Sequence, residues 1–326
     1  MRWLLRIMCA AVIAAGPTYP WPAAAGQDYP SRNVRVIVPY AAGGAGDILG
    51  RLLTNELQTQ LGQSFYIDNR GGAGGILAAT LAAQASADGY TLFEGATGPL
   101  GIAPFVHRSV EFDPIHSFAP VSLIAKTPYV LVVNPALPVK NVADLIALLK
   151  SKPGQLSFAS AGAGGPDHLA GVMFTEMTHT QAVHVPYKGA SLALVDVAAG
   201  RVQFQFVSPL PAMPMVASGQ LRVIAMTSSE RSPAMSDVPT VAETVPWFEV
   251  NPWYGILAPQ GTPQAIVDRL HDAIAAAVAN PNVRQHMIAS GLDPSPSTPK
   301  EFADLIAADR AKWGAIVKKA NIAATE

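Results

Sequence analysis

Short runs of β-branched and aromatic residues alternate with segments of helical periodicity along almost the whole chain. Residues 34–38, 65–67 and 90–93 have the composition of strands, and the leucines of residues 49–61 recur at helical spacing before Gly62. A further helix is expected at residues 76–85. Such alternation is typical of the α/β class, in which helical crossovers connect the strands of parallel sheets.

A second series of the same kind begins after Pro120. Strands are expected at residues 121–125, 129–133, 156–159, 182–185, 202–207 and 253–257. Helices are expected at residues 142–149, 169–177 and 192–199, and again from Pro263 to the end with a break near residues 291–299. The sequence thus predicts two doubly wound sheets with no flexible linker between them.

Ordered strands that cross near residues 121–130 and 246–255 are expected to join the two sheets, with a cleft between the resulting lobes. We place lobe 1 at residues 27–127 and 250–326, and lobe 2 at residues 128–249. Ligands of open α/β folds bind at the carboxyl ends of strands, which here face the predicted cleft.

The N-terminus has the pattern of a secretory signal peptide. Arg2 and Arg6 flank the start of an apolar run at residues 4–15, and small residues follow at 23–25. This run is too short to span a bilayer, which needs about 20 residues. We therefore expect residues 1–26 to be removed on export. Cys9 is the only cysteine and lies in this segment, so the mature chain has no disulfide or thiolate chemistry. A lipoprotein reading of Cys9 is weak, because the apolar run continues beyond it.

The charge of the mature chain excludes some partners. Without Arg2 and Arg6, 20 basic residues stand against 23 acidic ones, a net charge near −3. This balance argues against nucleic acid and anionic membranes. No later apolar stretch reaches spanning length, so no membrane insertion is expected. We expect an exported monomer of the periplasm.

Glycine-rich loops follow several predicted strands. Residues 39–47 and 159–168 each lead from a strand into a helix, and residues 95–99 end another strand. Glycine lets the backbone approach a ligand, and a helix N-terminus binds anions without a basic side chain. The alternative is an ordinary tight turn, with Asp47 as the N-cap of its helix. In residues 183–190, Tyr187 and Lys188 follow another predicted strand. Lys188 either binds the carboxylate of a ligand in the cleft or is a solvated turn residue.

Other functions have weaker support. The fingerprint G-x-G-x-x-G fails from Gly44, because Leu49 occupies the sixth place, although Asp68 stands where a ribose partner is expected. The chain has no G-x-S-x-G or H-E-x-x-H motif, so no hydrolase site is predicted. His179 and His184 lack the further ligands of a metal site. Trp247, Trp253 and Tyr254 fit core or hinge packing better than a ligand platform.

Several segments together resemble the Bug-type receptors, the substrate-binding proteins of tripartite tricarboxylate transporters. They occur in order over the mature chain: residues 29–39, Gly43-Gly44 with Asp47, and residues 69–75, 88–92, 118–121, 185–189, 237–240 and 257–259. The resemblance implies a type II periplasmic binding-protein fold, with two doubly wound α/β lobes joined by crossing strands. It also implies a receptor that closes on a carboxylate and delivers it to a membrane permease, with no cofactor, no metal and no enzymatic activity.

The resemblance and the loops together give a predicted ligand site. Its residues are Tyr40, Ala42, Gly43, Gly44, Asp47, Thr97, Gly98, Ser160, Ala161, Gly162, Gly164, Gly165, His168, Tyr187, Lys188, Val207 and Ser208. The second loop has Ala163 and Gly165 where the family commonly has side chains that hydrogen bond. Many members also carry an Asp after the strand at residues 202–207, where this chain has Val207-Ser208-Pro209. Its absence favours a plain mono- or dicarboxylate, aliphatic or aromatic, over an amino acid.

Two other classes stay open. A sensory protein that presents its ligand to a membrane signalling system would share these sequence features. An exported α/β enzyme would need a general base paired with a nucleophile, and no such pair is evident in the sequence.

Overall fold

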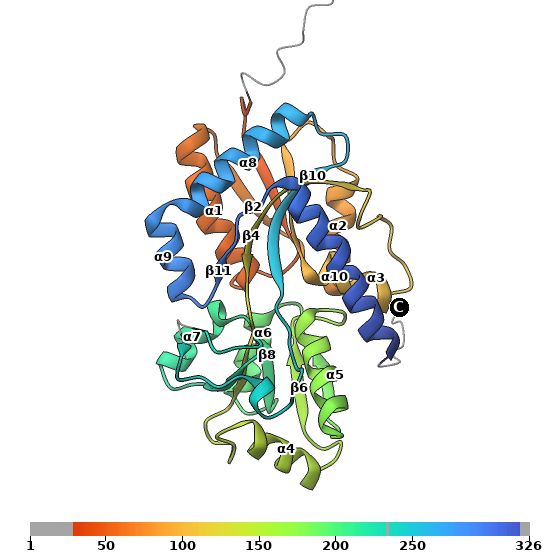
Figure 1. Ribbon diagram of the computed structural model, residues 1–326, viewed down its shortest axis with the longest axis vertical. Helices are drawn as coiled ribbons and strands as arrows, with labels where there is room; N and C mark the ends of the chain where they lie inside the picture. Colours follow the sequence, from red (N-terminus) through yellow and green to blue (C-terminus); the bar gives the residue numbers. More distant parts are fainter. Residues whose placement is uncertain (1–28, 233–234, 320–326) are drawn as a thin grey trace, which may run out of the picture.

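The computed structural model describes residues 29–232 and 235–319. The predicted signal peptide lies outside these residues. Two sheets with helices on their faces form two lobes, one above the other in Figure 1. This arrangement confirms the predicted α/β class with two lobes. We call the part built on the first sheet lobe 1 and the part built on the second sheet lobe 2; the exact boundaries given above stay a prediction.

The first sheet has the strand order β11-β4-β10-β3-β1-β2. Its strands are β1 (Val34–Val38), β2 (Phe65–Asn69), β3 (Thr91–Ala96), β4 (Phe118–Lys126), β10 (Trp253–Pro259) and β11 (Asp293–Pro294). The helices of this lobe are α1 (Ala45–Leu61), α2 (Ile76–Ala83), α3 (Ala103–Val106), α8 (Gln264–Ala279), α9 (Pro281–Ala289) and α10 (Pro299–Lys319), and a short π-helix, η2 (Thr97–Ile102), follows β3.

The second sheet has the order β7-β6-β8-β5-β9. Its strands are β5 (Val130–Val133), β6 (Ser157–Ser160), β7 (Val183–Pro186), β8 (Phe204–Val207) and β9 (Arg222–Met226). Its helices are α4 (Val142–Ser151), α5 (Pro166–Thr178), α6 (Ala190–Ala198) and α7 (Pro209–Ala217).

The expectation of wholly parallel sheets is wrong. β10 runs antiparallel to β3 and β4, and β5 runs antiparallel to β8 and β9. Both strands directly follow a segment in which the chain passes from one lobe to the other. They therefore enter their sheets without the helical connection that makes neighbouring strands parallel. The strand at residues 121–125 belongs to the first sheet, as part of β4, and not to the second series. Sequence patterns also missed β9 and α7, which contains Pro214 in its interior.

The two crossings lie side by side and are hydrogen bonded to each other. The Thr127 N–H of the first crossing donates to Pro252 O of the return crossing at 2.7 Å. The Val250 N–H of the return crossing donates to Thr227 O, directly after β9, at 3.0 Å. The Trp253 N–H donates to Thr97 Oγ1 at 3.0 Å, which attaches the return crossing to η2. The lobes are therefore joined by paired backbone segments.

Helical periodicity explains how lobe 1 is packed. Leu49, Leu53 and Leu57 of α1 are each 2% exposed or less and face the core shared with α8. Gly62 ends α1 in the left-handed conformation, with φ of 71°, and its N–H donates to Gln58 O. This is the C-terminal glycine expected after the last helical leucine.

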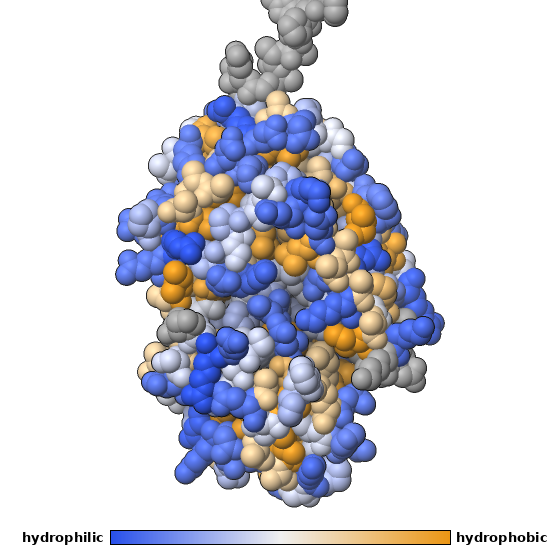
Figure 2. All heavy atoms as spheres, viewed as in Figure 1, coloured by the Kyte–Doolittle hydropathy of each residue, from blue (hydrophilic) through white to orange (hydrophobic). Residues whose placement is uncertain are grey.

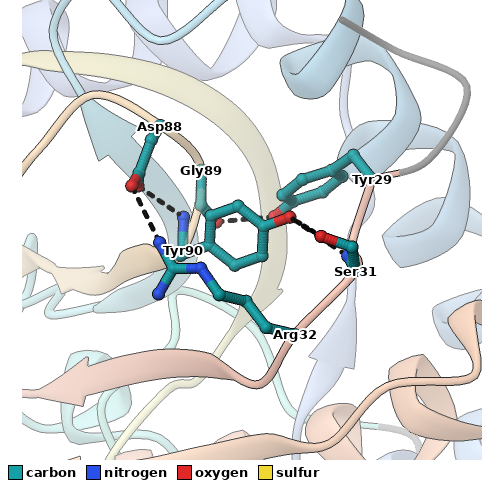
Figure 3. Close-up of polar contacts among 6 residues, drawn as sticks. All are labelled: Tyr29, Ser31, Arg32, Asp88, Gly89 and Tyr90. Atoms are coloured by element: carbon teal, nitrogen blue, oxygen red, sulfur yellow. Dashed lines mark hydrogen bonds and ion pairs between the residues drawn. The ribbon is translucent and has the colours of Figure 1, made fainter.

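The first described residues are fixed to the loop before β3, as Figure 3 shows. The Tyr29 hydroxyl donates to Gly89 O at 2.6 Å, and Arg32 forms an ion pair with Asp88 at 3.0 Å. The guanidinium of Arg32 also lies 3.9 Å from the centroid of the Tyr90 ring. Two segments of the family resemblance, residues 29–39 and 88–92, thus meet in space. Across residues 29–232 and 235–319, no helix is long and apolar enough to cross a membrane.

Candidate functional site

A small cavity of about 30 Å³ lies between the lobes. Lobe 1 contributes Tyr40, Gly44, Ala45 and Tyr254, and lobe 2 contributes Tyr129, Ala161, Pro166, Asp167, Ala190, Val207 and Ser208. We call it the inner cavity. It has room for a small polar group between residues of both lobes.

Four helices begin at the inner cavity. Ala45, Pro166 and Ala190 are the first residues of α1, α5 and α6, and Ser208 is the N-cap of α7. None of the four N-cap residues makes a side-chain capping hydrogen bond. Each helix N-terminus carries roughly half a positive charge, so both lobes direct positive potential into this cavity without any lysine or arginine in its wall.

Three tyrosines supply hydroxyl groups to the same wall. Burial raises the pKa of Tyr40, Tyr129 and Tyr254, in each case well above the usual value for a phenol. The hydroxyls of Tyr129 and Tyr254 lie close to each other, and each influences the pKa of the other. These groups are neutral at physiological pH and can donate a hydrogen bond to an anionic oxygen.

Asp167 is the single carboxylate in the wall of the inner cavity. Its side chain accepts hydrogen bonds from the Ala161 N–H and, at 3.0 Å, from the His168 N–H. Burial nevertheless raises the pKa of Asp167 to about 6, because the two N–H groups offset only part of the cost of desolvating the charge.

A wider groove of about 520 Å³ adjoins the inner cavity and shares Tyr40 and Ala161 with it. We call it the outer groove. Its wall combines the loop at Gly72–Gly75 of lobe 1 with Gly162, Ala163 and the segment 186–188 of lobe 2. The wall is mostly apolar, and Lys188 is its one cationic residue. In Figure 2 the surface recedes where the upper and lower lobes meet.

The structure brings together part of the predicted site. Tyr40, Gly44, Ala161, Val207 and Ser208 line the inner cavity, and Gly162, Tyr187 and Lys188 line the outer groove. The Tyr187 hydroxyl points to α6, where it donates to Asp196 at 2.6 Å. Ligand contact by any of these residues stays a proposal.

Asp47, Ala42 and Gly43 were also predicted as ligand residues, but they line neither cavity. Asp47 is not an N-cap: Gly44 holds that place, and Asp47 lies in the first turn of α1. Its carboxylate accepts from the Gly43 N–H at 2.9 Å and pairs with Arg51 at 2.8 Å, contacts that hold its pKa below the usual value even though burial opposes them. Ala42 and Gly43 are exposed, and Ala42 O accepts from Ser191 Oγ at 3.2 Å across the lobes.

Thr97 and Gly98 also have structural roles. Thr97 is buried, and its hydroxyl accepts the Trp253 N–H. A Cβ on Gly98 would lie 2.4 Å from the Tyr40 hydroxyl, so glycine at this position leaves room for that side chain.

Three histidines contact the second glycine-rich loop, residues 159–168. Ser160 Oγ and His184 Nε2 are hydrogen bonded at 2.6 Å, and the Gly164 N–H donates to His168 Nδ1 at 3.2 Å. The rings of His168 and His184 stack with centroids 3.9 Å apart. His107 of lobe 1 reaches the same loop, where its Nε2 lies 3.2 Å from Ala163 O. Gly165 is the N-cap of α5.

Sequence reasoning missed several residues of the two walls. Tyr129 and Tyr254 lie in strand regions, where their apolar neighbours indicate a core. Trp253 is indeed buried, but Trp247 is 93% exposed rather than packed. Asp167 lies within a predicted loop but is not among the predicted ligand residues. The run Gly71-Gly72-Ala73-Gly74-Gly75 after β2 has the same composition as the predicted loops and was the available signal for the outer groove.

The rejected alternatives have structural explanations. Asp68 is bound by Arg35 and, at 2.8 Å, by Arg70, so it is not a free partner for a ribose. In the part of the chain that the structure describes, no three His, Cys, Asp or Glu side chains are grouped to hold a metal ion.

A two-lobe α/β fold with a cavity between the lobes is typical of solute-binding proteins. Residues 49–322 match the model of the tripartite tricarboxylate transporter family receptor, so the chain belongs to this family. It is a solute-binding receptor of the Bug type, as the resemblance implied.

Solved structures agree with this assignment. R. palustris Rpa4515 with adipate is 36% identical, with a TM-score of 0.89 over 91% of this chain and 100% of that one. The periplasmic binding protein BugD is 30% identical, with a TM-score of 0.88 over 91% and 100%. MatC from Rhodopseudomonas palustris with bound malate is 32% identical, with a TM-score of 0.85 over 89% and 100%.

Proposed function

We propose that this protein captures a small mono-, di- or aromatic carboxylate in the periplasm and delivers it to the membrane permease of a tripartite tricarboxylate-type transporter. The observation that carries the proposal is the convergence of four helix N-termini on one cavity between the lobes. The relatives whose structures contain adipate and malate support a carboxylate ligand.

The energetics are consistent with capture through backbone and hydroxyl groups alone. A hydrogen bond to a charged group contributes about 1.5–3 kcal/mol. Three or four such bonds approach the roughly 8 kcal/mol that a micromolar Kd requires. Apolar contact with the outer groove offsets part of the ordering and association cost. An arginine clamp is therefore unnecessary.

Contacts across the cleft support capture by closure. Closure shifts with ligand only if the closed state binds it better than the open state. Both lobes line the inner cavity, so a ligand there gains contacts that one lobe alone does not offer.

A thermal-shift and calorimetric screen of the mature protein tests the proposal. It should contain mono-, di- and tricarboxylates, aromatic acids and amino acids, with the neutral amide of each acid as its matched control. We expect at least one acid to raise Tm and to bind with a micromolar or lower Kd, while its amide does not. Stabilisation by amides or cationic solutes alone would show that the site is not a carboxylate site.

Gly44→Val tests the position of the site. Gly44 has an ordinary φ of −79°. A Cβ there would lie 3.3 Å from Ala41 O, a close contact that a shift of a few tenths of an ångström in the exposed loop relieves. Because Gly44 lines the inner cavity, we expect the methyl groups of the introduced valine to fill it and to weaken binding of the selected acid at least tenfold. Circular dichroism of the ligand-free variant checks the fold. Unchanged affinity would remove this loop from the site.

Delivery to a permease separates transport from sensing. Co-purification of the protein with a membrane permease, and loss of uptake of the selected acid on deletion of the protein, are the expected results. A signalling defect with normal uptake would instead identify a sensory receptor.

A further inference from the structure

Asp167 places a negative charge in the wall of a cavity that otherwise favours anions. It is the second residue of α5, it is 3% exposed, and it lines the inner cavity together with Val207 and Ser208. The sequence argument against an amino group rested on the lack of an acid after β8. The structure supplies an acid to the same cavity from a different element.

The charge of Asp167 lacks a cationic partner. Within residues 29–232 and 235–319, no lysine, arginine or histidine forms an ion pair with it. Two backbone N–H groups reach its carboxylate, and each oxygen keeps a lone pair for a further donor. Buried carboxylates are almost always paired, so a cationic group in the cavity would complete this site.

Two nearby acids show why Asp167 differs. Asp47 is paired with Arg51. Glu94 is fully buried without a hydrogen-bond donor on either oxygen, and this burial raises its pKa well above the usual value, which keeps it neutral. Asp167 has N–H donors and the N-terminus of α5 to sustain its charge at neutral pH, but no cationic side chain pairs with it. It is therefore the acid available to a ligand.

We infer that the captured carboxylate also carries an ammonium group, and that Asp167 is the specificity-determining residue that binds it. The inference rests on the proposed function and narrows it to amino acids and related zwitterions. The helix N-termini face the carboxylate, while Asp167 and the tyrosine hydroxyls accept the three N–H donors of the ammonium.

The arrangement of the two cavities fits this division. The helix N-termini and Asp167 lie at the inner cavity, which adjoins the outer groove at Tyr40 and Ala161. The remainder of the ligand would extend into the outer groove of about 520 Å³, which is mostly apolar.

Matched pairs of acids that differ only in the amino group test the inference. The acid selected by the screen is compared with its amino counterpart, such as succinate with aspartate, propionate with alanine, or 3-phenylpropionate with phenylalanine. Calorimetry at pH 7.5 on ligand-free mature protein gives both Kd values. We expect the amino member to bind at least tenfold more tightly.

Asp167→Asn removes the charge but keeps an oxygen that accepts the Ala161 N–H, so the loop should persist. We expect this variant to lose the preference for the amino member. Asp113→Asn is the control, because Asp113 lies on an exposed turn where it contacts His116 and neither cavity; its preference should equal that of the wild type.

Several results would overturn the inference. Equal or tighter binding of the plain acid at pH 7.5 leaves the carboxylate receptor intact but removes the ammonium subsite. Plain acids that bind more tightly at pH 5.5, together with tighter binding by Asp167→Asn at pH 7.5, would show that Asp167 takes up a proton instead. A preference for the amino member that survives in Asp167→Asn would assign the ammonium to other groups. If no acid binds, with or without an amino group, the proposed function itself fails.

Discussion

At the scale of single residues, the position of Tyr40 depends on a glycine far from it in sequence. An ideal Cβ on Gly98 would lie 2.4 Å from the Tyr40 hydroxyl, closer than two such atoms can approach. The side chain of Tyr40 therefore reaches the inner cavity only because residue 98 has no side chain. Neither residue alone indicates this contact.

A double-mutant cycle measures the contact. Gly98→Ala should lower the free energy of unfolding by about 1–3 kcal/mol, the range for overpacking in a core. It should also weaken ligand binding, because Tyr40 must move. In a Tyr40→Phe background the hydroxyl is gone, so the same substitution should cost less, by a coupling of at least about 0.5 kcal/mol. Urea unfolding of the four proteins gives the result; additive effects would mean that the two residues do not interact.

The two glycine-rich loops differ at the residue level although their sequences look alike. Gly44 has an ordinary backbone conformation, whereas Gly164 has a φ of +79° and a Cβ there would lie 2.6 Å from Val106 Cγ2 of lobe 1. A valine at residue 164 would therefore strain the loop and press against the opposite lobe. Valine is therefore a better test of the site at residue 44 than at residue 164.

At the scale of elements, α1 approaches β3 through two glycines. Gly46 and Gly50 are one helical turn apart, and a Cβ on either would lie 2.7 Å or less from a carboxylate oxygen of Glu94. The fully buried Glu94 side chain thus occupies a slot in the helix surface. This packing places the N-terminus of α1 at the inner cavity.

Gly50→Ala tests the slot. In an open helix this change stabilises by about 1 kcal/mol. Here we expect net destabilisation by about 1–3 kcal/mol, because the new methyl group overlaps Glu94. The double variant Gly50→Ala with Glu94→Ala should recover much of the difference, measured relative to Glu94→Ala alone by urea unfolding. Stabilisation by Gly50→Ala in the wild-type background would contradict this account.

The loop before α5 makes stability depend on pH in two opposing ways. Burial lowers the pKa of His168 from 6.5 to about 4 and of His184 from 6.5 to about 3, and each is lowered further by a neighbouring imidazole. The unfolded chain therefore binds these protons first, so acidification below pH 6.5 destabilises the fold. Asp167 has the opposite sign, because its native pKa of about 6 exceeds the ordinary aspartate value of 3.8. Its protonation favours the native state between about pH 6 and 4.

Variants separate the two effects. One proton changes the free energy of unfolding by about 1.4 kcal/mol per pH unit. Between pH 6 and 4, Asp167→Asn should lose stability more steeply than the wild type by up to this amount. His184→Gln should lose it less steeply by a similar amount. Urea unfolding across this range measures both slopes; parallel curves for all three proteins would show that neither group titrates as described.

At the scale of the whole molecule, the two lobes share apolar packing around Trp313 as well as polar contacts across the cleft. Ser191 Oγ donates to Ala42 O at 3.2 Å, His107 Nε2 lies 3.2 Å from Ala163 O, and Tyr129 contacts Tyr254. We expect opening to turn the lobes about the paired crossings and to separate these contacts. Ligand affinity should therefore depend also on contacts between the two lobes, even where the residues involved do not touch the ligand.

His107→Ala tests this dependence. His107 lies in neither cavity wall, so its removal should weaken binding through closure alone. Loss of a contact of about 1 kcal/mol corresponds to roughly a fivefold weaker affinity. Small-angle scattering should show a larger radius of gyration for the ligand-free variant and the same radius as wild type at saturating ligand. An unchanged Kd and radius would show that the contact does not stabilise the closed form.

Much of the architecture was predictable from local patterns. Residues 34–38 form β1 as expected, and Gly62 ends α1, because hydrophobic period and the backbone freedom of glycine act over a few residues. Local patterns failed to predict α7, because a proline inside a helix is unfavourable and Pro214 lies in its interior. Tertiary packing overrides this local preference. The antiparallel direction of β10 and β5 depends on where the chain crosses between lobes, which no local pattern records.

Part of the candidate site could be predicted from the sequence. Glycine-rich loops at strand ends pointed to Gly44, Ala161 and the helix N-termini, since that chemistry is local to each βα turn. Tyr129, Tyr254 and Asp167 became cavity residues only when distant segments met. By itself the sequence determined the α/β class, the loops that precede helices and the family. Only the tertiary structure decided which side chains face the cavity. The cavity forms where the two lobes meet, and the residues that meet there are far apart in the chain.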